Sequence, residues 1–242
     1  MGDTYKAWLD EREAESRRMQ EAMMNGIAGR LNRPRPLSAP QHPFRGAPDF
    51  WEQVEWPLPE RLARFAANFT AAGGIVERLP DWDAAGEYIA RQAEKLGARY
   101  VVRQNQPELD ALQLGERLPE EARITRWNRD PAEDMRARAA EADIGIILAD
   151  HAVASTGSIV AVSHRDKGRS VSLLPTALFA LIPVERVKTR LGEVLAGFDQ
   201  AGQSALPAGI HFISGPSRSA DIENDLTIGV HGPGIVFALL VG

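Results

Sequence analysis

Residues 142–150 of the chain read ADIGIILAD, an apolar run with an acidic residue near or at each end. An uninterrupted apolar run of this length is typical of a strand in the centre of a parallel sheet, where both faces are covered. A half-exposed strand would instead alternate apolar and polar residues. This stretch therefore predicts the central strand of the fold.

Upstream of this strand, helical and extended patterns alternate along the chain. Helices are predicted for LPERLARFAANFTAAGG, DWDAAGEYIARQAEKLG, PELDALQLG and DPAEDMRARAAEA, and strands for GIVERL, ARYVVRQ and ARITRW. In the last of these helices, Asp130 is the expected N-cap and Pro131 the first helical residue. Such alternation predicts parallel strands covered by helices.

Downstream of residue 150 the pattern changes. Two apolar runs in GSIVAVSHRDKGRSVSLLP are joined by the charged segment HRDKGR, which predicts a β-hairpin. ALFALIPV, GIHFIS and GIVFALLVG predict three further strands, and RVKTRLGEVLAGF predicts an amphipathic helix. The fold class is therefore α/β, with a layered, mostly parallel sheet and a mixed second half.

The N-terminal part differs from this pattern. Residues 4–24 are rich in good helix formers and predict a helical arm that lies on the body or on a partner. The apolar stripe of this arm is thin and consists of Trp8, Leu9, Met19 and Met23. Residues 33–48, RPRPLSAPQHPFRGAP, predict an extended connector, because proline interrupts helices and central strands. We therefore expect an arm and connector over residues 1–49 and one α/β domain over residues 50–242.

Composition excludes several classes of function. The 242 residues carry a net charge of −5, which does not favour binding to nucleic acid, and they include no cysteine. Disulfides, thiolate nucleophiles and cysteine-bound iron–sulfur clusters are thereby excluded from this chain. The five histidines show no close metal-binding spacing, so no metal is predicted. With no signal peptide and no membrane span in the pattern, the expected location is the cytoplasm.

The loop DHAVASTGS, residues 150–158, follows the central strand and ends in Thr156, Gly157 and Ser158. Small hydroxyl residues around a glycine allow backbone N–H groups to approach an anion or a carbonyl closely. We interpret the three residues as candidate ligand contacts. The plain alternative is a crossover between two strands.

The segment SGPSRSADIE, residues 214–223, carries two patterns at once. Ser219 is an expected helix N-cap, followed by two acidic residues in a first turn, where the helix dipole favours them. Ser217 and Arg218 have no part in that cap, and a hydroxyl beside a guanidinium is typical of a clamp for a carboxylate or phosphate. We therefore expect Arg218→Ala to weaken ligand binding while stability stays nearly unchanged.

The segment GVHGPG, residues 229–234, places His231 between glycines ahead of the last predicted strand. An imidazole titrates near neutral pH and suits an acid–base group or an anion contact, although a lone histidine is more often structural. Open α/β sheets bind ligands at the carboxyl ends of their strands. The three loops are therefore expected to converge there in one pocket.

Three stretches together resemble the LUD-domain family of lactate-utilisation proteins: ADIGIILADHAVASTGSIV, SVSLLPTAL and FISGPSRSADIENDLTIGVHGPG. The resemblance runs from about residue 60 to the last residue and implies a fold like that of NagB, ribose-5-phosphate isomerase and the CoA transferases. It also implies a role in oxidising L-lactate to pyruvate beside partner subunits that carry the iron–sulfur clusters. This chain would then hold no cofactor and would contribute binding of a small anionic metabolite, or assembly.

One position departs from the family pattern. Many relatives carry glutamate directly before the Thr-Gly pair, where this chain has Ser155. Fold relatives that transfer CoA use a glutamate nucleophile, so the carboxylate needed for an acyl anhydride is missing here and a binding site is expected instead. Two alternatives stay open: a free-standing enzyme of the NagB or CoA-transferase type acting on a phosphorylated or CoA-linked metabolite, and an interaction scaffold with a vestigial pocket.

Overall fold

The computed structural model describes residues 2–38, 53–220 and 225–242. By its internal contacts the chain divides into two units, Met1–Asp49 and Phe50–Gly242. In the first unit, the predicted arm is confirmed as helix α1 (Gly2–Arg30), which extends beyond the predicted limits. Its large apolar side chains are exposed: Tyr5, Trp8, Leu9, Met19, Met23, Met24 and Ile27. Of the proline-rich connector, residues 39–48 lie outside the described residues.

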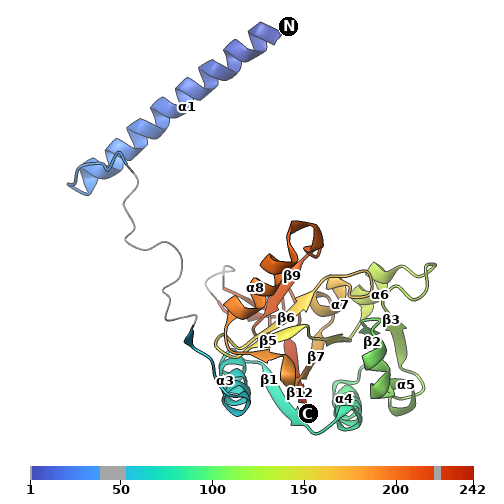
Figure 1. The fold of residues 1–242 in the computed structure, drawn as a ribbon. Helices are drawn as coiled ribbons and strands as arrows, with labels where there is room; N and C mark the ends of the chain where they lie inside the picture. The colour runs from blue at the N-terminus through green and yellow to red at the C-terminus, as the bar shows by residue number, and fades with distance from the viewer. Residues whose placement is uncertain (1, 39–52, 221–224) are drawn as a thin grey trace. The chain divides into compact units, whose positions relative to one another are not determined.

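A six-stranded sheet forms the centre of the second unit, and all its strand pairs are parallel. In spatial order its strands are β1 (Ile75–Leu79), β12 (Ile235–Val241), β7 (Ala177–Pro183), β4 (Ile144–Leu148), β2 (Tyr100–Arg103) and β3 (Arg123–Arg126). All of them except β4 are labelled in Figure 1. Every residue of β4 and β7 is buried, as the unbroken apolar runs predict for strands covered on both faces.

One face of this sheet is covered by helices that follow β1 and β2. They are α4 (Trp82–Leu96), the 3₁₀-helix η1 (Pro107–Leu112) and α5 (Leu114–Arg117) (Figure 1). Asp81 caps α4 by accepting a hydrogen bond from the N–H of Ala84, and Gly97 ends the helix in the left-handed conformation. Completely buried side chains such as Ile89 of α4 and Phe179 of β7 form one core cluster here.

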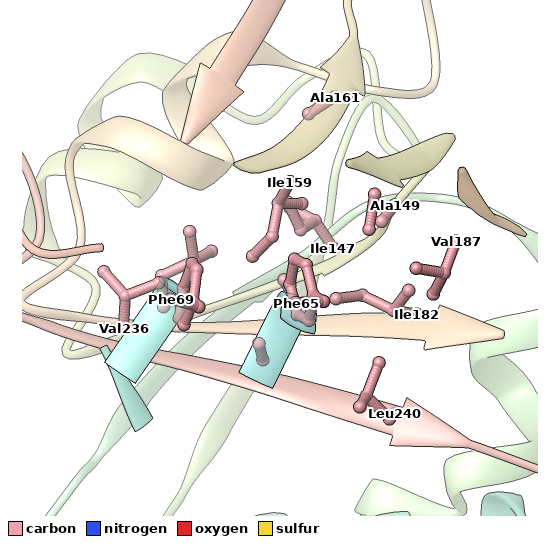
Figure 2. Packing of buried hydrophobic residues seen from close by; sticks show 14 of the residues in the cluster. Phe65, Phe69, Ile147, Ala149, Ile159, Ala161, Ile182, Val187, Val236 and Leu240 are labelled. Carbon is pink, nitrogen blue, oxygen red and sulfur yellow. The ribbon is translucent and has the colours of Figure 1, made fainter. Parts of the chain in front are cut away.

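The opposite face is covered by three helices and a second sheet. The helices are α3 (Leu58–Ala71), α6 (Met135–Glu141) and α7 (Arg169–Leu173). The second sheet contains, in spatial order, β8 (Val187–Lys188), β5 (His151–Val153), β6 (Ser158–Val162) and β9 (Ile210–Ile213). Figure 2 shows the core on this face, where Phe65 and Phe69 of α3 share a cluster with Ile159 of the second sheet and Val236 of the central sheet.

The remaining elements are short, apart from α8 (Leu191–Ala201), which packs against the outer side of the second sheet through Val194. They are the 3₁₀-helices η2 (Val184–Arg186) and η3 (Gln203–Ala205), and the antiparallel pair β10 (Arg218–Ser219) and β11 (Thr227–Ile228). The observed architecture confirms an α/β fold with a mostly parallel sheet. The NagB-like type of that sheet stays a prediction.

Two local predictions are wrong. The segment HRDKGR does not join two paired strands: β6 is followed by a turn closed by the backbones of His164 and Lys167, and then by helix α7. Strand β6 pairs instead with β5 and β9. The helix predicted from Asp130 begins later, because the carboxylate of Asp134 accepts the N–H groups of the first helical turn.

The helix predicted for RVKTRLGEVLAGF is correct only in its second half. Val187 and Lys188 form strand β8, and the helical residues begin at Leu191. Glu193 accepts a hydrogen bond from the N–H of Arg190, which fixes the start of the helix.

Candidate functional site

The hairpin between β5 and β6 contains the first predicted loop. The turn holds Gly157 at a φ of +60°, pressed against α3, where a Cβ atom would lie 2.6 Å from the nitrogen of Phe69. The side-chain amide of Asn68 donates to the carbonyl oxygen of Ala154 at 2.8 Å. The glycine therefore allows the hairpin to approach the helix closely.

A chain of three hydroxyl groups begins beside this turn. The hydroxyl oxygen of Thr156 lies 2.8 Å from that of Ser158, which in turn lies 2.7 Å from that of Ser214. Ser158 is buried, whereas Thr156 and Ser214 are exposed. Because each hydroxyl both donates and accepts, the chain can turn its terminal donor or acceptor toward a ligand.

The second predicted loop is not a helix cap at Ser219. Ser219 lies in β10, opposite Thr227, and the residue after it is not helical. The acidic residues of the expected first turn lie outside the described residues. Ser219 pairs with β11 instead, and a local cap pattern does not reveal such a pairing.

Arg218 reaches the C-terminal end of α3. Its guanidinium donates to the carbonyl oxygen of Ala72 at 2.5 Å, although much of the side chain is exposed. A cation at this end of a helix is favoured, because the last carbonyl groups lack partners within the helix. Arg218 thus has a structural partner in addition to its predicted role toward a ligand.

His231 and Ser217 are brought together by the third loop. The N–H of His231 donates to the hydroxyl of Ser217 at 3.2 Å, and the N–H of Ser217 donates to the carbonyl of Pro233. This loop directly precedes β12, so it lies at the amino end of the central strands. The prediction that it lies at the carboxyl end is wrong, because a loop that enters a strand lies at the opposite edge from one that leaves it.

The six predicted residues surround the C-terminal end of α3 through intermediate contacts. Gly157 lies against Asn68 and Phe69, Thr156 is linked through Ser158 to Ser214, and Arg218 donates to Ala72. Ser217 lies close to Ser214 in the sequence, and its hydroxyl accepts the N–H of His231. Whether these residues share one pocket stays a prediction.

Sequence reasoning missed a charged group at the carboxyl end of β4. The carboxylate of Asp150 pairs with the ammonium of Lys167 at 2.5 Å and accepts the N–H of Val162. Beside it, burial, and then the positive charge of Lys188, lower the pKa of His151. The available signal was the Asp-His pair directly after the central apolar run.

The chain leaves β2 and β4 toward opposite faces of the sheet, so the carboxyl ends of these neighbouring strands form a switch point. Buried Gln104 lies there, and its side-chain oxygen accepts the N–H of Leu148 at 3.0 Å. In open α/β sheets such a switch point is the usual position of a ligand. Gln104 therefore belongs to the candidate site as well, although it lies in none of the three predicted loops.

Two structural features bear on cofactors and membranes. Within residues 2–38, 53–220 and 225–242, no group of three or more histidine, aspartate or glutamate side chains is arranged to hold a metal ion. In the same part of the chain, no helix combines the length and the apolar character needed to cross a bilayer.

A parallel sheet with polar loops at both edges and a second sheet on one face defines a layered α/β protein. The family model for the LUD domain matches residues 62–241, and the chain belongs to the LUD-domain family.

Several known proteins are similar to this chain. "Lactate utilization protein C" of Halalkalibacterium halodurans is 34% identical over 217 residues, which cover 88% of this chain and 94% of that protein. The protein of the same name from Bacillus subtilis is 31% identical, with coverages of 88% and 92%. The crystal structure of a DUF162 family protein from Deinococcus radiodurans matches with a TM-score of 0.56 at 17% identity, over 77% of this chain and 99% of that one. The last similarity supports the fold alone.

Proposed function

We propose that the chain is a cytoplasmic subunit of an iron–sulfur complex that oxidises L-lactate to pyruvate. The observation that carries the proposal is the similarity, over most of the chain, to relatives named for lactate utilisation. The absence of cysteine from all 242 residues supports a division of labour in which partner subunits bind the clusters.

In this proposal the chain supplies binding of a small anionic metabolite, or assembly, rather than electron transfer. The proposed ligand contacts are Thr156, Gly157, Ser158, Ser217, Arg218 and His231. Support comes from the hydroxyl chain that starts at Thr156 and from the exposure of Arg218, whose guanidinium has N–H groups beyond the one given to Ala72. Ser155 in place of a glutamate favours binding over acyl transfer.

The complex is tested by co-expression with candidate cysteine-rich iron–sulfur proteins. We expect these proteins to co-purify with the chain and the mixture to reduce a dye in a lactate-dependent way, whereas the chain alone is colourless and inactive. An iron–sulfur chromophore or lactate oxidation in the pure chain would contradict the proposal.

The ligand site is tested separately, by thermal unfolding with L-lactate and pyruvate. We expect these anions to stabilise the wild type more than Arg218→Ala. Arg64→Ala is the matched control, because Arg64 lies on α3, the helix that Ala72 caps, but pairs with Glu60 on an exposed surface. Equal stabilisation of all three proteins would remove Arg218 from the site.

A further inference from the structure

Two arginines lie side by side at the carboxyl ends of β2 and β3. Arg103 and Arg126 are the last residues of these strands and are partners in the parallel register. Residues two positions earlier, Val101 and Ile124, belong to the core on the α4 face, and side chains two apart in a strand share a face. Both arginines therefore point to the α4 face of the sheet, away from α3.

These two arginines share one carboxylate. Nη2 of each contacts the same oxygen, Oδ1 of Asp110 in η1, and the Arg126 contact measures 3.2 Å. The Arg103 side chain is 4% exposed, whereas that of Asp110 is 50% exposed. One half-exposed carboxylate thus serves two cations, one of which is almost completely withdrawn from water.

Further charges around the pair leave it under-neutralised. Arg129 follows β3 and has no carboxylate partner among the residues that the structure describes. Asp130, the next residue, accepts the N–H of Ala132, and Glu133 pairs with Arg123 and Arg138. Burial, followed by the positive charge of Arg126, lowers the pKa of Arg103, as expected where like charges lie close together.

A cavity of about 440 Å³ opens onto the pair and has the size of a small-molecule site. Arg103, Asp110 and Arg126 line it, together with residues 113–116. A second hollow, of about 580 Å³, shares Arg126 and also reaches Arg129. Glu116 lies at the rim, exposed and without an ion pair to either arginine within the described part of the chain.

We propose that this cavity binds a small oxyanion, the phosphate or carboxylate group of a metabolite, through Arg126 and Arg103. Guanidinium groups match such anions because their N–H donors form a planar fork. In the absence of a ligand, the carboxylate of Asp110 occupies the position beside the two guanidinium groups. When an anion binds, the exposed Asp110 side chain moves out of part of this position. The site lies on the opposite face of the sheet from α3 and does not depend on the lactate assignment.

The test is calorimetric titration of the full chain at pH 8 with inorganic phosphate and, separately, with malonate, against chloride of equal ionic strength. We expect saturable binding that Arg126→Gln weakens at least about tenfold, since a hydrogen bond to a charged group has that effect. Arg64→Gln, which also removes an arginine with one carboxylate partner, should leave binding unchanged. Binding of phosphate alone assigns a phosphate group, and binding of malonate alone assigns a carboxylate.

A second variant separates a binding site from a merely structural ion pair. Asp110→Asn removes the carboxylate that competes with the ligand, so we expect it to bind the anion more tightly than the wild type. A purely structural role predicts the opposite, because the cavity would be disturbed. The proposal is overturned if neither anion binds above chloride, if Arg64→Gln weakens binding as much as Arg126→Gln, or if Asp110→Asn binds no more tightly.

Discussion

Replacing Gly157 by alanine should destabilise the protein strongly, although only one methyl group is added. A Cβ atom at this position would lie 2.6 Å from the nitrogen of Phe69, and 2.7 Å and 2.8 Å from the carbonyl carbon and Cβ of Asn68. Two of these three atoms belong to the backbone of α3, so no side-chain rotation relieves all of the contacts. The residue also has a φ of +60°, a conformation that L-amino acids adopt at a cost.

The magnitude follows from these two contributions. The left-handed conformation costs about 1–2 kcal/mol for a residue with a Cβ atom. Overfilling a packed region costs about 1–3 kcal/mol more, because the hairpin has to move away from the helix. We therefore expect Gly157→Ala to lower the free energy of unfolding by roughly 2–5 kcal/mol in total.

Gly97→Ala is the matched control for the conformational part. Gly97 has nearly the same φ, +62°, but nothing lies within 4 Å of the position that a Cβ atom would occupy. This variant should lose only about 1–2 kcal/mol. Both free energies are measured by urea unfolding followed by circular dichroism, with equal m-values required for the comparison.

The difference between the two variants measures the contact between the hairpin and α3. If Gly157→Ala and Gly97→Ala lose the same free energy, the close approach of Gly157 to Phe69 is not a rigid contact. The structural account of the Thr-Gly pair would then be refuted.

Three further predictions follow from the charged groups. Arg218→Ala should lower stability by about 0.5–1.5 kcal/mol in urea unfolding, because the carbonyl of Ala72 loses its donor; an unchanged midpoint would favour a role toward a ligand alone. Asp110→Asn should cost about 1–3 kcal/mol in thermal unfolding, because buried Arg103 loses its carboxylate, and a loss below about 0.5 kcal/mol would argue against the pair. Burial lowers the pKa of His151 in the folded state, so the unfolded state binds the proton more readily. Stability should therefore fall as pH decreases below about 6.5. His151→Gln should flatten this dependence, which is measured by unfolding between about pH 5 and about pH 8.

The sequence predicts strands well where burial alone determines the pattern. The runs around β4, β7 and β12 are apolar throughout because both faces are covered, and the structure confirms all three. It predicts strand pairing poorly. Strand β6 and the apolar run of α7 lie on either side of a charged turn, which resembles a hairpin in the sequence. The actual partners of β6 are β5 and β9, which pack over α3, and the local pattern does not contain this packing.

The same distinction applies to the candidate site. The glycine between hydroxyl residues predicted a close approach to a ligand, and the structure shows that Gly157 lies close to α3. The partner of Arg218 lies 146 residues away in the sequence. No spacing rule connects Arg218 to Ala72. The arginine pair had a weak signal, since each of the predicted strands ARYVVRQ and ARITRW has arginine as its second-to-last residue. Their parallel register was needed to place Arg103 beside Arg126.

The position of β12 in the central sheet has a consequence for biosynthesis. Strand β1 ends at Leu79, yet its hydrogen-bonding neighbour in the sheet, β12, begins at Ile235. During translation, β1 therefore remains without its partner until β12 has left the ribosome. Strand β7 likewise lacks one of its two neighbouring strands until then. Non-local pairing of this kind slows folding and leaves apolar strand edges open to other chains. The nascent protein thus depends on its last strand to close the sheet, and chaperones that shield unpaired edges have their longest opportunity before that strand emerges.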